Sequence, residues 1–320
     1  MIYYAQFKEE VANKVMLRKG VTMNATPTVS IITPTYNRGN LLQRCYDSLV
    51  IQTSKDFEWI IVDDGSLDNT REMVSRFDSD FDIIYIIKKN GGKHTALNAS
   101  HPYIHGKCVL ILDSDDYLIS DAIKKVIKAW NEYGSIETIG IVTFLKGESV
   151  DKPFCYGKYE RIPVDIMRGK RICMQSNDCC EIVRSDLFKK YPFPVYKGEK
   201  YFPEGVLWNK VSFTHKCVYI NEVVYIAEYL DGGLTKSGRR LRVRNPRGGM
   251  YSARINMHRK NRWRSRLKNG VLYNCYCFFV GVSPYKIVKK NPYKVLTILC
   301  MIPGWIVHLY WKEKYLKEEN

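Results

Sequence analysis

Three apolar stretches of this chain, each ending in polar residues, decide its fold. They read VSIITPTYN (residues 29–37), FEWIIVDDGS (57–66) and CVLILDSDD (108–116). Each begins as an aliphatic or β-branched run typical of a buried strand. We expect strands at 29–33, 57–62, 83–87 and 108–112, and helices, from apolar residues at helical spacing, at 40–51, 68–77, 94–99 and 121–130.

Strands that alternate with helices predict an α/β fold with a doubly wound, mostly parallel sheet. Ligands of such sheets bind beyond the carboxyl ends of the strands. The polar clusters 34–37, 63–66 and 113–116 are therefore expected to meet at one rim. After residue 135 the alternation weakens, although 139–145 and 218–226 still predict strands.

The DSDD cluster after the fourth strand has the side chains of a site for a hard cation. Asp113 and Asp115 are two residues apart, so both carboxylates can point into one space. Mg²⁺ and Mn²⁺ take such oxygens together with those of a diphosphate and water. A solvated turn with an Asp helix cap has the same sequence, so the cluster gains weight only from its neighbours on the rim.

Those neighbours suit a nucleotide. Asp64 can accept hydrogen bonds from a base or ribose, and Tyr36 can stack on a base. The turn Gly91-Gly92-Lys93-His94 offers backbone N–H groups and a cation to a phosphate. The chain has no G-x-x-x-x-G-K-[ST] and no G-x-G-x-x-G after its first strand, which excludes a P-loop and argues against a dinucleotide fold.

These segments, together with NRGNLLQRCYDSLVIQT (37–53) and NGGKHTALNAS (90–100), resemble the inverting glycosyltransferase family 2, which has a GT-A fold. The resemblance runs from about residue 29 to 118 and implies a nucleotide-sugar donor, with UDP as the preferred nucleotide. It implies Mn²⁺ or Mg²⁺ bound by Asp115 and Asp113. The implied donor-binding residues are Pro34, Tyr36, Asp64, Lys93, Asn98, Asp113 and Ser114. Lys93 and His94 depart from the small residues common at their positions in the family.

An inverting transfer also needs a carboxylate that takes a proton from the acceptor hydroxyl. The resemblance implies Glu-Asp, with the Asp four residues before an aromatic residue. Here Glu204 stands four residues before Trp208, so it takes the Asp position, and Pro203 takes the Glu position. The rival carboxylates are Asp178 and Glu199. A helix N-terminus would also favour Glu204, and Trp208 fits either helix core or a sugar platform on the acceptor side.

The net charge of +17 is concentrated in one part of the chain. Residues 232–311 hold 17 Lys and Arg and no Asp or Glu, which leaves 33 basic and 33 acidic residues elsewhere. In this segment Lys236 lies in a predicted loop (233–238) that we expect to close on the diphosphate or acceptor. Nucleic-acid binding is disfavoured because the arginines adjoin apolar helices rather than a recognised binding motif.

The basic segment also contains two apolar runs, 271–283 and 295–311, and Pro303-Gly304 divides the second. Interfacial docking on an anionic membrane is the favoured interpretation, because Trp305, Tyr310 and Trp311 suit the headgroup boundary. A membrane span or re-entrant hairpin, and a buried helical subdomain, stay open as alternatives.

The predicted organisation is an N-terminal extension (1–27), a GT-A catalytic domain (28–231, divided into a donor half to residue 120 and an acceptor half from 121) and the basic segment (232–320). The cysteines have no zinc spacing, and charges interrupt the first 19 residues, so we expect a reduced, cytoplasmic protein on the inner face of the cell membrane. The predicted activity is a hexosyl transfer to a lipid-linked glycan in surface-polysaccharide synthesis. A sugar-phosphate nucleotidyltransferase and a non-catalytic polyanion-binding or membrane-binding module remain as alternatives.

Overall fold

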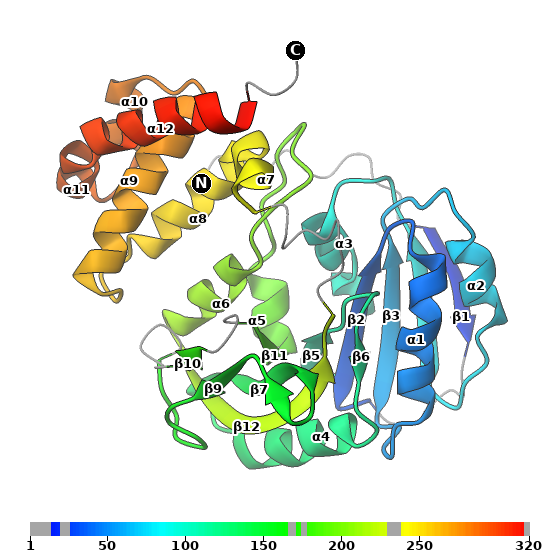
Figure 1. Ribbon diagram of the computed structural model, residues 1–320. Coiled ribbons are helices and arrows are strands. Elements are labelled where there is room, and N and C mark those ends of the chain that lie inside the picture. The colour runs from blue at the N-terminus through cyan, green and yellow to red at the C-terminus, as the bar shows by residue number, and fades with distance from the viewer. Residues whose placement is uncertain (1–13, 20–25, 166–170, 174–177, 229–237, 317–320) are drawn as a thin grey trace.

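The computed structural model describes residues 14–19, 26–165, 171–173, 178–228 and 238–316 (Figure 1). Its strands are β1 (Lys14–Lys19), β2 (Val29–Thr35), β3 (Phe57–Asp63), β4 (Asp82–Ile87), β5 (Cys108–Ile111), β6 (Tyr117–Leu118), β7 (Ile139–Ser149), β8 (Lys152–Pro153), β9 (Cys155–Gly157), β10 (Arg171–Cys173), β11 (Cys179–Arg184) and β12 (Lys216–Ile226). Its helices are α1 (Gly39–Val50), α2 (Thr70–Arg76), α3 (Lys93–Ala99), α4 (Ala122–Tyr133), α5 (Ser185–Lys190), α6 (Gly205–Ser212), α7 (Gly238–Arg244), α8 (Pro246–Asn256), α9 (Trp263–Phe279), α10 (Pro284–Lys290), α11 (Lys294–Leu299) and α12 (Met301–Leu316).

The central sheet runs in the order β1-β4-β3-β2-β5-β11-β7-β12-β6. The four strands predicted first in the chain, β2, β3, β4 and β5, pair in parallel as expected. Their carboxyl ends therefore lie at one edge of the sheet. Beyond β5 the sheet is mixed, because β11 runs antiparallel to both β5 and β7 while β12 is parallel to β7.

Helices cover both faces of this sheet. One face packs on α1, α2 and α4 through residues such as Leu42, Val74 and Val126. The other packs on α3, α5 and α6 through residues such as Leu97 and Leu207. Every residue of β2 and β3 is buried, which is why these strands are mostly apolar and do not alternate. Buried polar residues within them find partners inside the sheet, as where the Ser30 hydroxyl donates to the Glu58 carboxylate at 2.5 Å.

A strand forms within the predicted N-terminal extension. β1 pairs antiparallel with β4 and so covers that edge of the sheet. Its sequence, KVMLRK, carries charged residues at both ends and gives little periodic signal. The pairing therefore depends on an exposed edge of β4, which the local sequence does not reveal.

The basic segment folds as a helical unit, α7 to α12, beside the sheet (Figure 1). Its central helix is α9, which buries Tyr273, Cys275 and Cys277 against neighbouring helices. The apolar run 271–283 therefore supplies much of the interior of this unit. Among the helices that the structure describes, none has both the length and the apolar character needed to cross a bilayer.

The break in the second apolar run lies at Cys300, between α11 and α12, and not at Pro303-Gly304 as predicted. Pro303 falls in the first turn of α12, where a backbone N–H has no partner within the helix, so its missing donor costs nothing. Gly304 continues the helix and lies against α9. A Cβ atom at this position would be only 2.5 Å from the Cβ of Asn274.

Candidate active site

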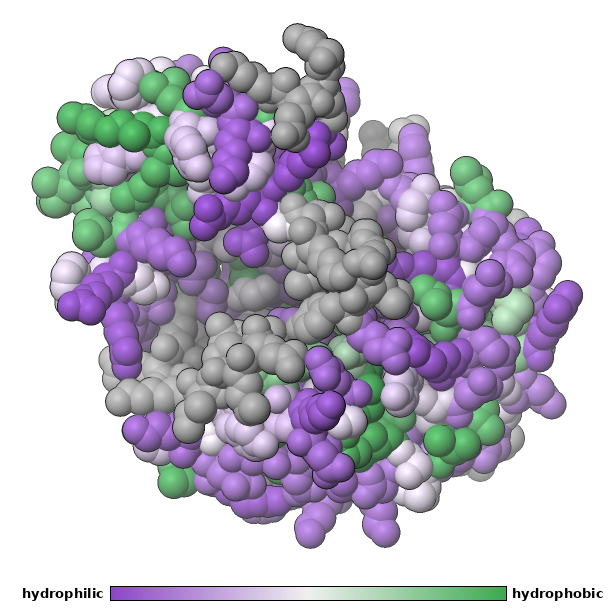
Figure 2. All heavy atoms as spheres, in the orientation of Figure 1, coloured by the Kyte–Doolittle hydropathy of each residue, from purple (hydrophilic) through white to green (hydrophobic). Residues whose placement is uncertain are grey.

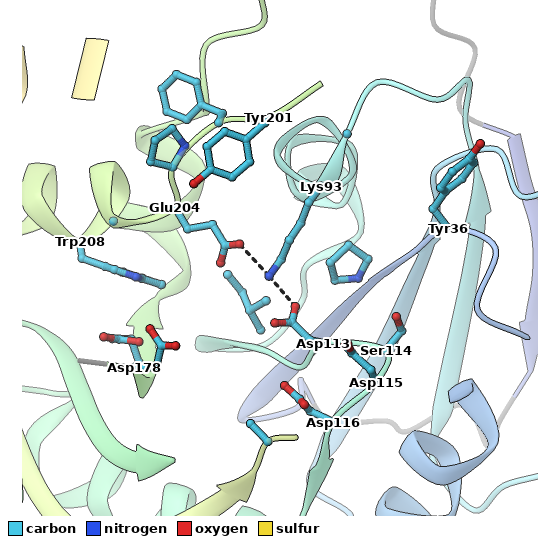
Figure 3. Close-up of a pocket in the computed structure, with 18 of the residues that line it drawn as sticks. Tyr36, Lys93, Asp113, Ser114, Asp115, Asp116, Asp178, Tyr201, Glu204 and Trp208 are labelled. Carbon is cyan, nitrogen blue, oxygen red and sulfur yellow. Dashed lines mark ion pairs between the residues drawn. The ribbon is translucent and has the colours of Figure 1, made fainter. Parts of the chain in front are cut away.

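A cavity of about 980 Å³ opens at the carboxyl ends of the parallel strands, between the sheet, α6 and the start of the helical unit. The three polar clusters predicted to converge all reach it. The predicted site residues on its wall are Pro34, Tyr36, Asp64, Lys93, Asp113, Ser114, Asp115, Asp178, Glu204 and Trp208. Figure 3 shows that the side chains of Lys93, Asp113 and Glu204 point toward one another across this space.

Lys93 joins the two halves of the cavity. It is the first residue of α3, and its Nζ lies 2.5 Å from Oδ1 of Asp113 and 2.7 Å from Oε1 of Glu204 (Figure 3). Burial alone would lower the pKa of Lys93, but the charges of these two carboxylates raise it above its ordinary value. The lysine is therefore a fixed cation between a carboxylate of the donor half and one of the acceptor half.

Asp113 is held by a network behind the cavity wall. Its backbone N–H donates to Oη of Tyr225 at 2.9 Å, and that hydroxyl donates to Oδ2 of Asp116 at 2.7 Å. Burial opposes ionisation of Asp113, yet the positive charges of Lys93 and Lys146 hold its pKa below the usual value. Burial and the charge of Asp113 raise the pKa of Asp116 to about 7. Asp113 therefore ionises more readily than Asp116, and Asp116 holds the Tyr225 hydroxyl that anchors the Asp113 backbone.

Asp115 faces a second cation. Its carboxylate lies 2.7 Å from Nη1 of Arg38, in the loop between β2 and α1, and its carbonyl accepts a hydrogen bond from Arg44. The two carboxylates expected to bind a metal are therefore paired with Lys93 and Arg38. Among the described residues, no group of three or more His, Cys, Asp or Glu side chains is arranged to hold a metal. Two hard oxygen donors fit Mg²⁺ or Mn²⁺ only if the other ligands arrive with a diphosphate and water.

Asp64 shapes the glycine turn. Its buried carboxylate accepts hydrogen bonds from Nζ of Lys88 at 2.5 Å and from the backbone N–H groups of Gly91 and Gly92 at 3.0 and 2.6 Å. Gly92 has a φ of 93°, and a Cβ there would lie 1.8 Å from the carbonyl oxygen of Lys200. Only glycine lets the donor-half turn approach the acceptor half this closely.

Two predicted residues have their side chains engaged elsewhere. Both ends of the Asn98 amide bond the backbone of Phe193, at 2.7 and 2.8 Å, and Asn98 does not line the cavity. Glu199 is buried and also lies off the cavity wall. Its carboxylate accepts hydrogen bonds from the backbone N–H groups of Arg247 and Gly248 at the start of α8. Asn98 thus ties α3 to the loop after α5, and Glu199 caps a helix.

Of the remaining predictions on the acceptor side, Asp178 lies on the cavity wall. Trp208 lies one turn after Glu204 on α6, where it packs partly against the core and partly borders the cavity. Glu204 is also the N-cap residue of α6. It therefore stands at a helix start and lines the cavity, as both interpretations of the sequence expected. Lys236 and residues 233–237 of its predicted loop lie outside the described residues, and the last residue of that loop, Gly238, begins α7.

The sequence interpretation missed several basic residues of the wall. Arg38, Lys146 and Arg242 all line the cavity. Arg38 lies in the segment NRGNLLQRCYDSLVIQT (37–53), next to the first strand end, so the sequence could have indicated it. Lys146 on β7 and Arg242 on α7 reach the site only through tertiary packing, and no local pattern marks them.

Comparison with known proteins now identifies the core of the chain. The family model described as Glycosyl transferase family 2 matches residues 30–187, which include the donor-side rim and Asp178. Residues 30–187 are a family 2 glycosyltransferase domain. The match starts at β2 and ends in α5, so it covers the parallel strands and the first part of the acceptor half.

Curated relatives agree with the family 2 assignment. The chain is 28% identical over 222 residues to glycosyltransferase GlyA of Streptococcus pneumoniae serotype 4, covering 65% of this chain and 31% of that protein. It is 42% identical over 107 residues to a hyaluronan synthase of Pasteurella multocida, covering 33% and 11%. The family 2 chain thus spans a third or less of the length of these relatives.

Solved structures share the fold. A crystal structure of S. aureus TarS 1–349 in complex with UDP-GlcNAc has a TM-score of 0.54 at 16% identity, covering 90% of this chain and 92% of that one. The Pyrobaculum calidifontis mannosyltransferase PcManGT, in complex with GDP-Man and Mn²⁺, has a TM-score of 0.55 at 14% identity, covering 92% and 89%. These similarities confirm the predicted GT-A-like fold.

Proposed function

We propose that this chain is a metal-dependent inverting glycosyltransferase that moves a sugar from a UDP-sugar to a hydroxyl of a lipid-linked glycan. The observation that carries the proposal is the Lys93 bridge. It sets an acceptor-side carboxylate, Glu204, across one cavity from the Asp113 carboxylate. Family membership, and structural neighbours that bind UDP-GlcNAc or GDP-Man, support a nucleotide-sugar donor.

The donor would bind at the rim of the parallel strands. Tyr36 is 43% exposed beside the cavity and is free to stack on the base. Three of the four acceptor positions of the Asp64 carboxylate are used by Lys88 and the glycine turn, which leaves one for the base edge. Lys93 and Arg38 supply positive charge to the diphosphate.

Asp113 and Asp115 would hold Mn²⁺ or Mg²⁺, which would neutralise the charge of the leaving nucleoside diphosphate. Each of these carboxylates is paired with a cation in the unliganded site, so binding of the metal and donor would require both ion pairs to exchange partners. Lys93 and Arg38 would turn from Asp113 and Asp115 toward the phosphate oxygens as the donor enters. The positive charge thus stays within the site throughout.

Glu204 would act as the general base. Its carboxylate is partly exposed to the cavity, and it accepts the proton of the acceptor hydroxyl as that oxygen bonds to the anomeric carbon. The bond from that carbon to the diphosphate oxygen breaks, and the configuration inverts. Trp208, on the same face of α6, would border the acceptor sugar.

The acceptor side of the cavity suits an anionic glycan carrier. Arg242 and Lys200 line it, together with the polar side chains of Ser252 and Asn256 from α8. A lipid-linked diphosphate would place its negative charge near these basic groups. This arrangement supports synthesis of a surface polysaccharide at the inner face of the cell membrane.

The test is release of nucleotide from a panel of UDP-sugars and GDP-mannose, with and without Mn²⁺, compared with Asp115→Asn. We expect UDP release from at least one donor with metal, and its loss in the variant while the far-UV circular dichroism spectrum is unchanged. Release of pyrophosphate from a sugar phosphate and UTP would indicate a nucleotidyltransferase instead. No turnover of any substrate would leave a non-catalytic binding module.

A further inference from the structure

Helices α11 and α12 carry an apolar stripe on their outer face. The apolar stripe is defined by eight side chains that are 45% to 73% exposed: Val295, Ile298, Leu299, Ile302, Trp305, Ile306, Leu309 and Tyr310. They recur at intervals of three and four residues, which places them along one side of the two helices. Figure 2 shows apolar side chains gathered on this end of the helical unit, whereas the sheet domain is mostly hydrophilic in the same view.

The opposite face of α12 fixes this orientation. Gly304 is buried against α9, where a Cβ would lie 2.5 Å from Cβ of Asn274 and 2.9 Å from the carbonyl oxygen of Val271. Trp311 is buried on the same side and meets Tyr276 edge-on, with ring centroids 5.9 Å apart. The helix cannot rotate to hide the apolar stripe without losing these contacts, so the stripe stays on the surface.

Basic side chains surround the apolar stripe. The exposed lysines next to it in the chain are Lys286, Lys289, Lys290, Lys294, Lys312 and Lys314, with one exposed carboxylate, Glu313, among them. The nearest preceding acidic residue is Asp231, and the whole segment 232–311 has no Asp or Glu. The partner that fits must therefore be apolar in its interior and negatively charged at its surface.

A second copy of this chain fits poorly. In a two-fold interface the same patch meets itself, so the lysines of one copy would face those of the other. In α7 to α12 the one carboxylate is Glu313, which is too few to offset the repulsion between the lysines. An anionic bilayer surface, by contrast, offers acyl chains to the stripe and phosphates to the lysines.

We propose that the apolar stripe docks into the headgroup region of an anionic membrane, with α11 and α12 lying along the surface. Trp305 and Tyr310 sit at the boundary between acyl chains and headgroups. Membrane docking does not require catalytic activity, but the role that we assign to it below rests on the proposed function. Because α7 and α8 of the same helical unit line the cavity, docking would keep the acceptor side close to lipid-linked substrates.

The experiment is flotation of the purified full-length chain with vesicles of phosphatidylcholine, or of an equal mixture with phosphatidylglycerol, at low and high salt. We expect binding to the anionic vesicles, weakened by salt. The double variant Ile302→Glu/Ile306→Glu should lower the partition coefficient by at least about tenfold. The control Val150→Glu/Ile162→Glu alters two apolar residues of the catalytic domain that are each 55% exposed, against 70% and 56% for Ile302 and Ile306, and should bind like the wild type.

Brominated lipids give a second readout. They should quench tryptophan fluorescence of the wild type, and Trp305→Phe should remove most of this quenching. Absence of binding to anionic vesicles, or equal binding by the stripe variant, would overturn the proposal. A wild-type dimer that the stripe variant converts to a monomer, without vesicle binding, would assign the stripe to self-association. Nucleotide release measured on the same samples separates a failure of docking from a failure of the proposed activity.

Discussion

The Nζ atom of Lys93 lies 2.7 Å from Oε1 of Glu204, so a side chain of the donor half touches the acceptor-side carboxylate before any substrate is bound. The same nitrogen lies 2.5 Å from Oδ1 of Asp113. One cation thus fixes the separation of two carboxylates with different proposed tasks. The family resemblance leads us to expect a small residue at the position of Lys93, so the bridge is a feature to test.

Replacing Lys93 with Met should lower kcat by about a hundredfold, because one preorganised cation is lost from the diphosphate site. It should also raise the pKa of Asp113, since the charge of Lys93 holds that pKa down. The acid limb of the pH–rate profile should therefore move to higher pH. Lys93→Arg should recover part of the rate, and the exposed Lys197→Met serves as control. An unchanged rate and profile in Lys93→Met would rule out a role for the bridge.

Arg38 should compete with the metal for Asp115, because their side chains lie 2.7 Å apart and are only partly exposed. Arg38→Gln should therefore tighten Mn²⁺ binding to the nucleotide-free protein by about fivefold, the scale of one partly exposed ion pair. In the wild type, UDP should strengthen Mn²⁺ binding more than it does in the variant. Electron paramagnetic resonance of free Mn²⁺ measures both effects. Weaker Mn²⁺ binding by Arg38→Gln would show that the arginine assists the metal.

Gly92→Ala should destabilise the fold by about 3 kcal/mol or more, because both a positive φ and a backbone clash oppose the new Cβ. Gly198 has a φ of 83° but no atom within 4 Å of a Cβ placed there. Gly198→Ala therefore measures the cost of a positive φ without a clash, which we expect to lower the free energy of unfolding by about 1 kcal/mol. Urea unfolding of both variants gives the comparison. If both variants lose the same free energy of unfolding, the close approach of Gly92 to Lys200 does not limit the residue at position 92.

His94 should make the fold sensitive to acid. Burial lowers the pKa of this histidine to about 4, against 6.5 in an unfolded chain. Between these values the unfolded chain binds more protons, so the free energy of unfolding falls as the pH drops from 6.5 through 4, by about 3 kcal/mol at most. Denaturant unfolding of His94→Leu should show a shallower decline, with a remainder from His101, whose pKa is also lowered to about 4. If the free energy of unfolding falls equally with pH in the wild type and in His94→Leu, His94 is not a source of the acid sensitivity.

The sequence predicts the donor half of this molecule well because its signals are local. The β-branched run of β2 and the acidic ends of β3 and β5 each fix a strand and its terminus, and parallel pairing then brings those termini together. The acceptor half depends on longer-range packing. β11 is a short segment, CCEIVR, with no apolar–polar alternation to mark it, and it inserts antiparallel between β5 and β7.

The same distinction divides the site residues. Residues next to strand ends, such as Tyr36 and Asp113, were predictable from position. Lys146 and Arg242 were not, since their elements meet the rim only in the folded chain. For Glu199, the sequence shows a carboxylate near Glu204 but not the start of α8 that its side chain caps.

The central claim is that Glu204 is the base of a glycosyl transfer, and a single comparison tests it. With the donor that releases nucleotide and a matching acceptor, kcat for transfer should fall by about a thousandfold or more in Glu204→Gln. Asp178→Asn, which alters the rival carboxylate on the same cavity wall, should stay within about tenfold of the wild type. The account is contradicted if Asp178→Asn loses the activity while Glu204→Gln retains it.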